Sequence, residues 1–240
     1  MNVIEDKRQY YIFKEAEGKR LALANNPTKI KVTDLGAGSL VNNGKTKSIS
    51  TIARSALSPD YQCKMLFRIV NHFKPKTMIE IGASLGIASI YQKAGALNAK
   101  MITLEGCPNI SNIARNLYLQ SKMDIELITG NFNNTFPKAL AELKSIDYVF
   151  FDGNHQFQPT LDYFHEAVEY SNDHTILVFD DIHWSADMER AWHEIQNHPK
   201  VTVALDLFHF GIIAFTKDVG IPIKRSIISW KYKPWRFGFF

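Results

Sequence analysis

The sequence predicts an α/β protein in which a mostly parallel sheet is covered by helices on both faces. Three observations support this fold class. Strand-like and helix-like segments alternate over most of the chain, a glycine-containing turn follows the first of these strands, and aspartates follow two later strands. This alternation is typical of βαβ units, and 240 residues with 45% hydrophobic content can bury one sizeable core.

Residues 6–24 carry apolar side chains at helical spacing and precede an Asn-Asn-Pro stop signal, so they are expected to form the first helix. Residues 31–39 look like a strand with a second glycine turn, but the polar segment that follows predicts no helix there. We therefore expect residues 34–39 to form a cap near a pocket. Ser58 and Pro59 predict an N-cap and a first-turn proline for a helix that ends near Phe73.

Strands and helices alternate from residue 77 onward. Seven strands are expected at residues 77–81, 101–105, 125–129, 147–151, 175–179, 201–205 and 212–216. Helices are expected at residues 85–94, from Pro108, and at 135–143, 159–170 and 186–197. The connection at residues 206–211 is too short for a parallel crossover, so the last two strands should form an antiparallel hairpin at the sheet edge.

Composition narrows the class of protein. The formal charge of +4 comes from scattered Lys and Arg residues, which does not indicate a nucleic-acid partner. Cys63 and Cys107 form no CxxC pair, so we expect two idle thiols in a reducing compartment. No apolar run is long enough to span a membrane, and the first residues are charged. We expect a soluble, cytoplasmic protein without stable membrane insertion.

The turn at residues 82–86 is typical of a nucleotide-type cofactor site. Gly82 lacks the Cβ that would block a ligand, and Gly86 lets the next helix begin close to the sheet. Glu105 ends the following strand, at the spacing where a carboxylate can bind ribose hydroxyls.

Three aspartates, Asp152, Asp180 and Asp181, follow consecutive strands, whose carboxyl ends border the ligand crevice of open α/β sheets. Clustered carboxylates repel each other unless a cation or proton offsets them. The pattern therefore favours an all-oxygen site for a divalent cation such as Mg²⁺. The alternative is that these aspartates cap the helices that follow.

Together, the seven strands, the terminal hairpin and the segment Glu80-Ile-Gly-Ala-Ser-Leu-Gly86 resemble the class I S-adenosylmethionine-dependent methyltransferases over about residues 65–217. The fold implied is Rossmann-like. Ser84 stands where dinucleotide-binding turns have a glycine, which disfavours an oxidoreductase. The resemblance implies that Gly82, Ser84 and Gly86 form the turn at the methionine moiety of S-adenosylmethionine.

The same resemblance implies roles for residues around this turn. Glu80 would support the turn, and Glu105 would accept hydrogen bonds from the ribose hydroxyls. Asn131 and Phe132 follow the third strand, where relatives contact adenine. The alternative for Phe132 is an ordinary core aromatic.

The motifs Asp-Gly-Asn-His at 152–155 and Asp-Asp at 180–181 resemble the metal-dependent O-methyltransferases of the macrocin and catechol types. This implies that Asp152, Asp180 and Asp181 hold the metal, which would activate a hydroxyl of a small-molecule substrate. Asp152 would also contact the cofactor. His155 would act as a general base or would orient Asp152. Trp184 and its neighbour His183 would line the substrate pocket, or Trp184 would only pack on a helix.

We expect an N-terminal helical extension at residues 1–60, a cofactor-binding domain at 61–220, and a basic aromatic tail at 221–240 that packs on the domain. The tail aromatics Trp230, Trp235 and Phe237 would otherwise pack across a homodimer interface. Two other functions stay open: a metal-independent methyltransferase, possibly one that methylates nitrogen, and a non-catalytic assembly protein. The remaining histidines are interpreted as surface or packing residues: His72, His165, His174, His193, His198 and His209.

Overall fold

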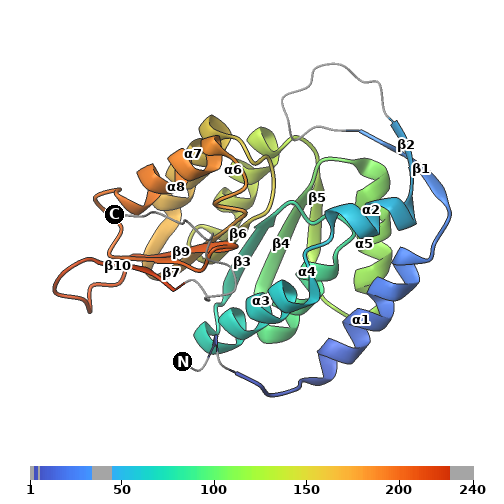
Figure 1. The fold of residues 1–240 in the computed structure, drawn as a ribbon, viewed down its shortest axis with the longest axis horizontal. Coiled ribbons are helices and arrows are strands. Elements are labelled where there is room, and N and C mark those ends of the chain that lie inside the picture. Colours follow the sequence, from blue (N-terminus) through green and yellow to red (C-terminus); the bar gives the residue numbers. More distant parts are fainter. Residues whose placement is uncertain (1–2, 5, 34–44, 228–240) are drawn as a thin grey trace, which may run out of the picture.

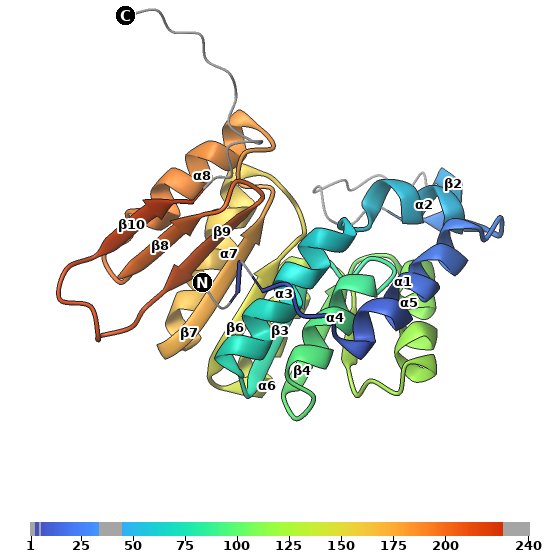
Figure 2. The ribbon, with the colours of Figure 1, turned by 60° about the horizontal axis from the view of Figure 1, so that its bottom comes forward.

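The computed structural model describes residues 3–4, 6–33 and 45–227. Within these residues, one large sheet with helices on both faces forms the body of the molecule, and a separate two-stranded hairpin lies near one end (Figures 1 and 2). The predicted fold class is therefore confirmed. The glycine turn predicted at residues 34–39 lies outside the described residues, so its expected role as a cap is not tested.

The described part of the large sheet has the strand order β10-β8-β9-β7-β6-β3-β4-β5. Only β9 runs against its neighbours there, because it pairs antiparallel with β7 and β8 while the other pairs are parallel. The predicted antiparallel hairpin of β8 and β9 is thus confirmed, although β10, and not the hairpin, forms this edge of the described sheet. The strands are β3 (Thr77–Ile81), β4 (Lys100–Glu105), β5 (Glu126–Thr129), β6 (Ile146–Phe151), β7 (Ser171–Asp180), β8 (Val203–Asp206), β9 (Phe210–Ala214) and β10 (Ile223–Ser226).

Successive residues of the central strands enter two different apolar clusters, because side chains alternate between the faces of a sheet. Tyr148 and Phe150 of β6 belong to one cluster, and Val149 and Phe151 belong to the other. The first cluster includes buried residues of α1 (Tyr11–Ala24), α2 (Ile49–Ala56), α3 (Asp60–Phe73), α4 (Ile87–Gly95) and α5 (Pro108–Gln120). The second includes α6 (Phe132–Leu143), α7 (Phe157–Tyr170) and α8 (Ala186–Gln196).

Helix starts differ from prediction in three places. The short helix α2 was not predicted; the Ser48 side chain caps it by accepting a hydrogen bond from the Thr51 N–H at 3.1 Å. In α3 the N-cap is Pro59, so the expectation that Ser58 caps this helix is wrong. Helix α6 begins three residues early because Asn131 caps it and accepts from the Asn133 N–H at 2.9 Å.

Strand β10 adds an eighth strand to the described sheet, where seven were predicted. It lies parallel to β8, and the flanking Ile227 N–H donates to the Asp206 carbonyl at 2.7 Å. All four of its residues are exposed, so no alternation of buried and exposed positions predicts this strand from the sequence. The remainder of the predicted tail, including Trp230, Trp235 and Phe237, lies outside the described residues.

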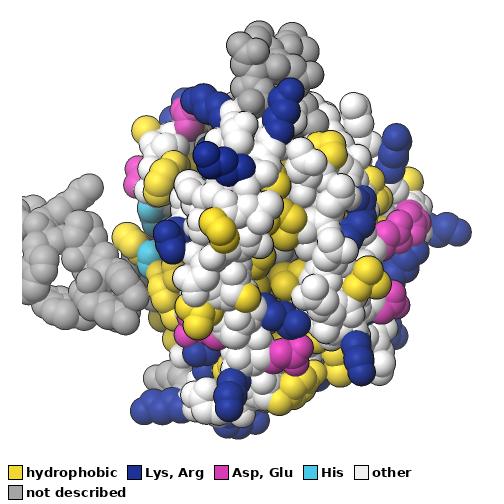
Figure 3. Space-filling view, turned by 90° about the vertical axis from the view of Figure 1, so that its right-hand side faces the viewer, with side chains coloured by type: hydrophobic (Ala, Val, Ile, Leu, Met, Phe, Trp, Pro, Cys, Tyr) yellow, Lys and Arg dark blue, Asp and Glu magenta, His cyan; other side chains and the backbone are white. Residues whose placement is uncertain are grey.

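Figure 3 shows the side of the molecule on which α1, α5 and the hairpin of β1 (Lys29–Val32) and β2 (Lys45–Ser48) lie. Lys and Arg side chains are spread over this face, with Asp and Glu between them, and form no continuous basic patch in this view. Among the helices of the described ranges, none combines the length and apolar character needed to cross a bilayer.

Candidate functional site

A cavity of about 960 Å³ opens at the carboxyl ends of the central strands. Gly82, Glu105 and Asp152 line it, and they stand at the ends of β3, β4 and β6. From β3 the chain proceeds to β4 and β5 on one side, whereas β6 and β7 lie on the other. The cavity therefore lies at the switch point of the sheet, where open α/β proteins bind ligands. Its size is within the range of small-molecule sites.

The turn after β3 is fixed to the end of β4 by backbone hydrogen bonds. The N–H groups of Gly82 and Ala83 both donate to the Leu104 carbonyl, at 3.0 and 2.9 Å. One carboxylate oxygen of Glu105 accepts from the Ser84 N–H at 2.9 Å, and the other accepts from the Cys107 N–H at 2.8 Å. Glu105 is thus held rigidly beside the turn, and Gly82, Ser84 and Glu105 all line the cavity.

A Cβ would not fit at either predicted glycine, because it would collide with neighbouring protein atoms. A Cβ on Gly82, whose φ is +98°, would lie 2.3 Å from the carbonyl oxygen of Asp152. A Cβ on Gly86, whose φ is +88°, would lie 2.6 Å from the Tyr118 ring of α5. Gly86 therefore lets α5 approach the start of α4, and it does not line the cavity.

Glu80 lies beneath the turn, fully buried and outside the cavity lining. Its carboxyl group accepts hydrogen bonds from the Ser89 hydroxyl and, at 2.6 Å, from the Gln92 amide, both on α4. Burial raises the pKa of Glu80 to about 7, against the lowering effect of these two donors. The structure thus places Glu80 where it ties α4 to β3, in keeping with support for the turn.

The two residues predicted near adenine separate in the structure. Asn131 does not line the cavity, because its side chain caps α6. Phe132 lines the cavity, yet it is only 6% exposed and belongs to an apolar core cluster. Both interpretations of Phe132 therefore describe part of its environment.

Asp152 and Asp180 face each other at the acidic end of the cavity, close enough for their carboxyl groups to share a hydrogen bond. Burial raises the pKa of both groups well above the ordinary value, and each is raised further by a negative neighbour, Glu80 for Asp152 and Asp152 for Asp180. The Ser58 hydroxyl donates to Asp152 and offsets part of this. The pair therefore favours a state in which at least one carboxyl group is protonated over a state with two negative charges.

Asp181 also lines the cavity, with a left-handed φ of 52°. Its N–H donates to the His209 carbonyl and to a carboxylate oxygen of Asp180, both at 2.9 Å. Within residues 3–4, 6–33 and 45–227, no group of three or more His, Cys, Asp or Glu side chains is arranged to hold a metal ion. The structure brings Asp152 and Asp180 together but does not assemble the predicted three-carboxylate ligand set.

Helix capping does not explain the aspartates either. The N-cap of α7 is Gln156, and the N-cap of α8 is Ser185, whose side chain accepts from the Met188 N–H at 3.2 Å. The capping interpretation of Asp152, Asp180 and Asp181 is therefore wrong. Their placement in a ligand-sized cavity calls for a chemical explanation.

His155 lines the cavity with its Nε2 atom 3.6 Å from Asp152 Oδ1. This position suits both predicted roles, proton acceptor and partner of Asp152. Trp184 also lines the cavity and is 74% exposed, so the expectation that it only packs on a helix is wrong. His183 does not line the cavity; its Nε2 atom lies 3.1 Å from Asp206 Oδ2, and its Nδ1 lies 3.3 Å from Glu189 Oε1.

The sequence interpretation missed one histidine and a whole wall of the cavity. His209, interpreted as a surface or packing residue, lines the cavity, and its Nε2 lies 2.9 Å from the Tyr61 hydroxyl. The available signal was that the 206–211 connection begins at the carboxyl end of β8, at the same sheet edge as the aspartates. Tyr61 belongs to a wall contributed by residues 55–62, for which the sequence carries no cofactor motif.

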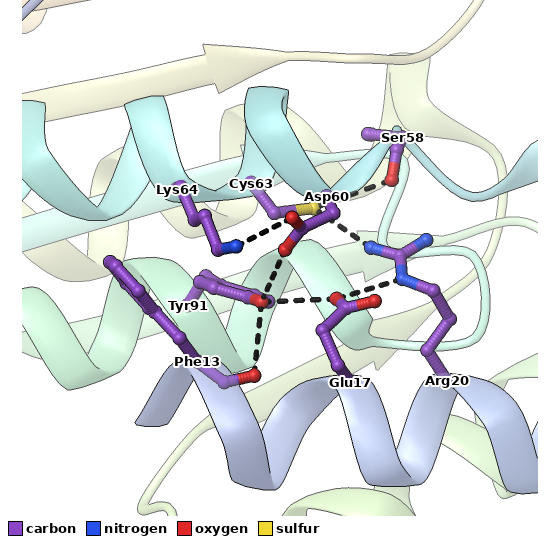
Figure 4. Close-up of polar contacts among 8 residues, drawn as sticks. All are labelled: Phe13, Glu17, Arg20, Ser58, Asp60, Cys63, Lys64 and Tyr91. Atoms are coloured by element: carbon purple, nitrogen blue, oxygen red, sulfur yellow. Dashed lines mark hydrogen bonds and ion pairs between the residues drawn. The ribbon is translucent and has the colours of Figure 1, made fainter. Parts of the chain in front are cut away.

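This wall is attached to the body of the protein through Tyr91, a fully buried residue of α4 (Figure 4). The Tyr91 hydroxyl lies 3.0 Å from Glu17 Oε1 on α1 and 3.2 Å from Asp60 Oδ1 in the first turn of α3. Arg20 and Lys64 neutralise these two carboxylates, at 2.9 and 2.6 Å. One hydroxyl therefore links three helices just beside the wall residues.

The cysteine in this cluster is not reactive. Cys63 is buried, its sulfur accepts from Arg20 at 3.3 Å, and burial raises the pKa of its thiol to about 12. Cys107 is also buried and free. Two unreactive thiols agree with the sequence interpretation.

Comparisons with known proteins concern the central part of this architecture. Residues 79–182 match the family described as a methyltransferase domain. This segment extends from β3 to just beyond β7 and contains the glycine turn, Glu105 and the aspartates, whereas the wall at residues 55–62 precedes it. No curated protein matches the chain.

Several solved structures share the fold. An O-methyltransferase from Bacillus cereus in complex with SAH aligns with a TM-score of 0.62 and 18% identity, covering 88% of this chain and 93% of the other. An SAH-bound methyltransferase from Podospora anserina gives 0.59 and 16%, covering 88% and 99%. The O-methyltransferase from Streptomyces achromogenes involved in tomaymycin synthesis, in complex with SAM, gives 0.58 and 18%, covering 67% and 82%.

Proposed function

We propose that this chain, which carries a methyltransferase domain in the class I fold, is an S-adenosylmethionine-dependent enzyme that methylates a hydroxyl group of a small molecule. The resemblance predicted from the sequence is confirmed by the domain match and by the fold. The single observation that carries the proposal is Glu105, held by the N–H groups of Ser84 and Cys107 at the edge of a ligand-sized cavity.

Glu105 suits the ribose of the cofactor. Each of its carboxylate oxygens accepts one backbone N–H, and an ionised carboxylate oxygen has two acceptor positions. The two backbone N–H groups thus hold the carboxylate at the edge of the cavity, where it would accept hydrogen bonds from the ribose hydroxyls. The names of the Bacillus cereus and Streptomyces achromogenes structures record SAH and SAM, which supports the same cofactor here.

Oxygen is proposed as the methyl acceptor because two of the structural neighbours are described as O-methyltransferases. When bound, S-adenosylmethionine supplies an electrophilic methyl group. Asp152 and His155, which line the cavity side by side, would orient the acceptor hydroxyl and take its proton. Alignment of the hydroxyl oxygen with the methyl group would provide most of the acceleration.

Metal assistance is a separate part of the proposal. A divalent cation such as Mg²⁺ would take the place of the proton between Asp152 and Asp180, with Asp181 beside them. The complete ligand set is not assembled in the described residues, so the proton transfer above does not depend on it. A chelator that abolishes methyl transfer, with recovery on added Mg²⁺, supports metal assistance; unchanged transfer favours a metal-independent methyltransferase.

Other parts of the sequence interpretation stay predictions. These are the domain boundaries after residues 60 and 220, a cytoplasmic location, and a homodimer built on the C-terminal aromatics. Size-exclusion chromatography with light scattering checks the homodimer directly.

The proposed function is tested by calorimetric titration with S-adenosylhomocysteine. The wild-type protein should bind it, and Glu105→Ala should weaken binding at least about tenfold, because hydrogen bonds to a charged group contribute about 1.5–3 kcal/mol. Glu126→Ala removes a carboxylate from an exposed position on the neighbouring strand β5 and should leave the affinity unchanged. A folded wild-type protein that does not bind the nucleoside contradicts the proposed function and favours a non-catalytic assembly role.

A further inference from the structure

The cavity is acidic at one end and basic at the other. Asp152, Asp180 and Asp181 follow β6 and β7, which lie on one side of β3. Lys45 and Lys47 of β2 also line the cavity, on a hairpin whose other strand, β1, contacts α5, the helix that follows β4. Figure 1 shows β1 and β2 close to α5, at the other end of the molecule from β7 and β9.

The hairpin that carries the lysines is fixed to the start of α5. The Asn109 side chain donates to the Lys31 carbonyl at 2.7 Å, and the Thr33 N–H lies 3.4 Å from the Cys107 sulfur. Cys107 is next but one to Glu105, the proposed ribose ligand. The lysines therefore belong to a wall anchored beside the cofactor end of the cavity.

Strand register separates the hairpin lysines into two faces. Lys45 pairs with Val32, and both line the cavity together with Lys47. Lys29 and Lys31 occupy the alternate positions, so they lie on the opposite face and do not line the cavity. The same four-residue ladder thus presents two lysines to the cavity and two away from it.

The two cavity lysines are exposed and form no ion pair within the part of the chain that the structure describes. The exposed Lys100, Lys200 and Lys217 do form such pairs. Positions i and i+2 of a strand are about 7 Å apart along the backbone, so two like charges lie on the same face of the hairpin. Glu105 is the carboxylate on their side, and its oxygens are engaged by backbone N–H groups. An anion between the lysines would offset these charges and receive hydrogen bonds from both.

We propose that Lys45 and Lys47 form an anion-binding subsite for the methyl acceptor. The acceptor is then an acidic molecule, with a phosphate or carboxylate group at the lysine end and its reactive hydroxyl at the aspartate end. The aspartates repel the anionic group and the lysines attract it, so the charge polarity of the cavity selects one orientation. The inference rests on the proposed function, since it names the substrate class of the same site.

The test uses two simple anions as probes. Protein saturated with S-adenosylhomocysteine is titrated with inorganic pyrophosphate and, separately, with citrate, at low and at high ionic strength. The wild type should bind at least one of them, more weakly at high salt. Lys45→Gln/Lys47→Gln should weaken this binding at least about tenfold, the equivalent of one lost charge-assisted hydrogen bond. The tighter of the two anions identifies phosphate or carboxylate as the preferred group.

A matched control is available on the same hairpin. Lys29→Gln/Lys31→Gln removes the same charge from the outer face and should leave anion affinity unchanged. Equal loss in both double variants, or no binding of either anion by the wild type, overturns the subsite. Thermal unfolding confirms that each variant is folded.

Failure of the subsite is distinguishable from failure of the proposed function. S-adenosylhomocysteine binding without anion binding overturns the subsite alone. If the nucleoside does not bind, the proposed function fails, and titration of the unliganded protein with the same anions still decides whether Lys45 and Lys47 hold an anion.

Discussion

Replacement of Tyr91 by phenylalanine tests how the wall at residues 55–62 is held. The Tyr91 ring is fully buried and packs 5.6 Å from the Phe13 ring, centroid to centroid. Its hydroxyl lies between Glu17 on α1 and Asp60 on α3 (Figure 4). Tyr91→Phe keeps the ring contacts and removes only the O–H group.

The expected cost follows from the partners of this hydroxyl. It can donate one hydrogen bond, and its acceptors are the two carboxylates and, at 3.5 Å, the Phe13 carbonyl. A bond to a charged group contributes about 1.5–3 kcal/mol. Glu17 and Asp60 keep Arg20 and Lys64 as ion-pair partners, so no uncompensated charge is left behind. We therefore expect the free energy of unfolding to fall by about 2 kcal/mol. In a chain of this length, that lowers Tm by about 4–8 °C.

Urea denaturation followed by circular dichroism, together with thermal unfolding, measures this change. Tyr11→Phe is the matched control, because Tyr11 is 65% exposed on the same N-terminal helix. It should change the free energy of unfolding by less than about 0.5 kcal/mol. If Tyr91→Phe is as stable as Tyr11→Phe, the hydroxyl does not hold α1, α3 and α4 together and the reasoning is refuted.

Three further predictions concern Glu80, Gly82 and Tyr148. Burial raises the pKa of Glu80 from 4.5 to about 7, so the folded state binds the proton more tightly. The contribution of Glu80 to the free energy of unfolding should then fall by about 3 kcal/mol between pH 4.5 and pH 7. Glu80→Gln should lack this pH-dependent decrease when stability is measured by urea denaturation at each pH. Parallel pH profiles for the variant and the wild type would contradict this. Gly82→Ala places a Cβ 2.3 Å from the Asp152 carbonyl oxygen at a φ of +98°. It should lower the free energy of unfolding by at least about 1 kcal/mol and weaken the binding of S-adenosylhomocysteine measured by calorimetry. Wild-type values for both quantities would rule out the clash. The buried Tyr148 hydroxyl has no hydrogen-bond partner among the described residues. Tyr148→Phe should therefore leave the free energy of unfolding in urea unchanged or raise it by up to about 1–3 kcal/mol. A clear loss of stability would show that the hydroxyl has a partner.

Local sequence pattern was sufficient for the centre of the site. Hydrophobic strands place whatever follows them at one edge of a parallel sheet, so Gly82, Glu105 and Asp152 could be assigned to the cavity before any contact was known. Gly86 and Asn131 also stand near strand ends, but Gly86 contacts α5, Asn131 caps α6, and neither lines the cavity. Their cofactor roles stay predictions. Proximity to a strand end does not decide which way a residue faces.

Contacts between distant parts of the chain could not be predicted from the sequence. The Tyr61–His209 hydrogen bond joins residues 148 positions apart, and no periodicity in either segment refers to the other. Strand β10 is exposed at every position, so only its backbone pairing with β8 reveals it. That Gln156 and Ser185 are the N-cap residues of α7 and α8 depends on where each helix begins, which sequence pattern locates only to within a few residues.

The sequence by itself determined the α/β class, the order of strands and helices between residues 77 and 216, and the residue types at the carboxyl edge of the sheet. These follow from side-chain periodicity and glycine placement, which are local properties of the chain. Tertiary structure decided that residues 55–62 wall the cavity and that burial raises the pKa of the neighbouring Asp152 and Asp180. It also decided that Lys45 and Lys47 line the cavity while Lys29 and Lys31 do not. The physical reason is that burial, charge pairing and facing depend on which segments meet in space, and that is fixed only when the whole core packs.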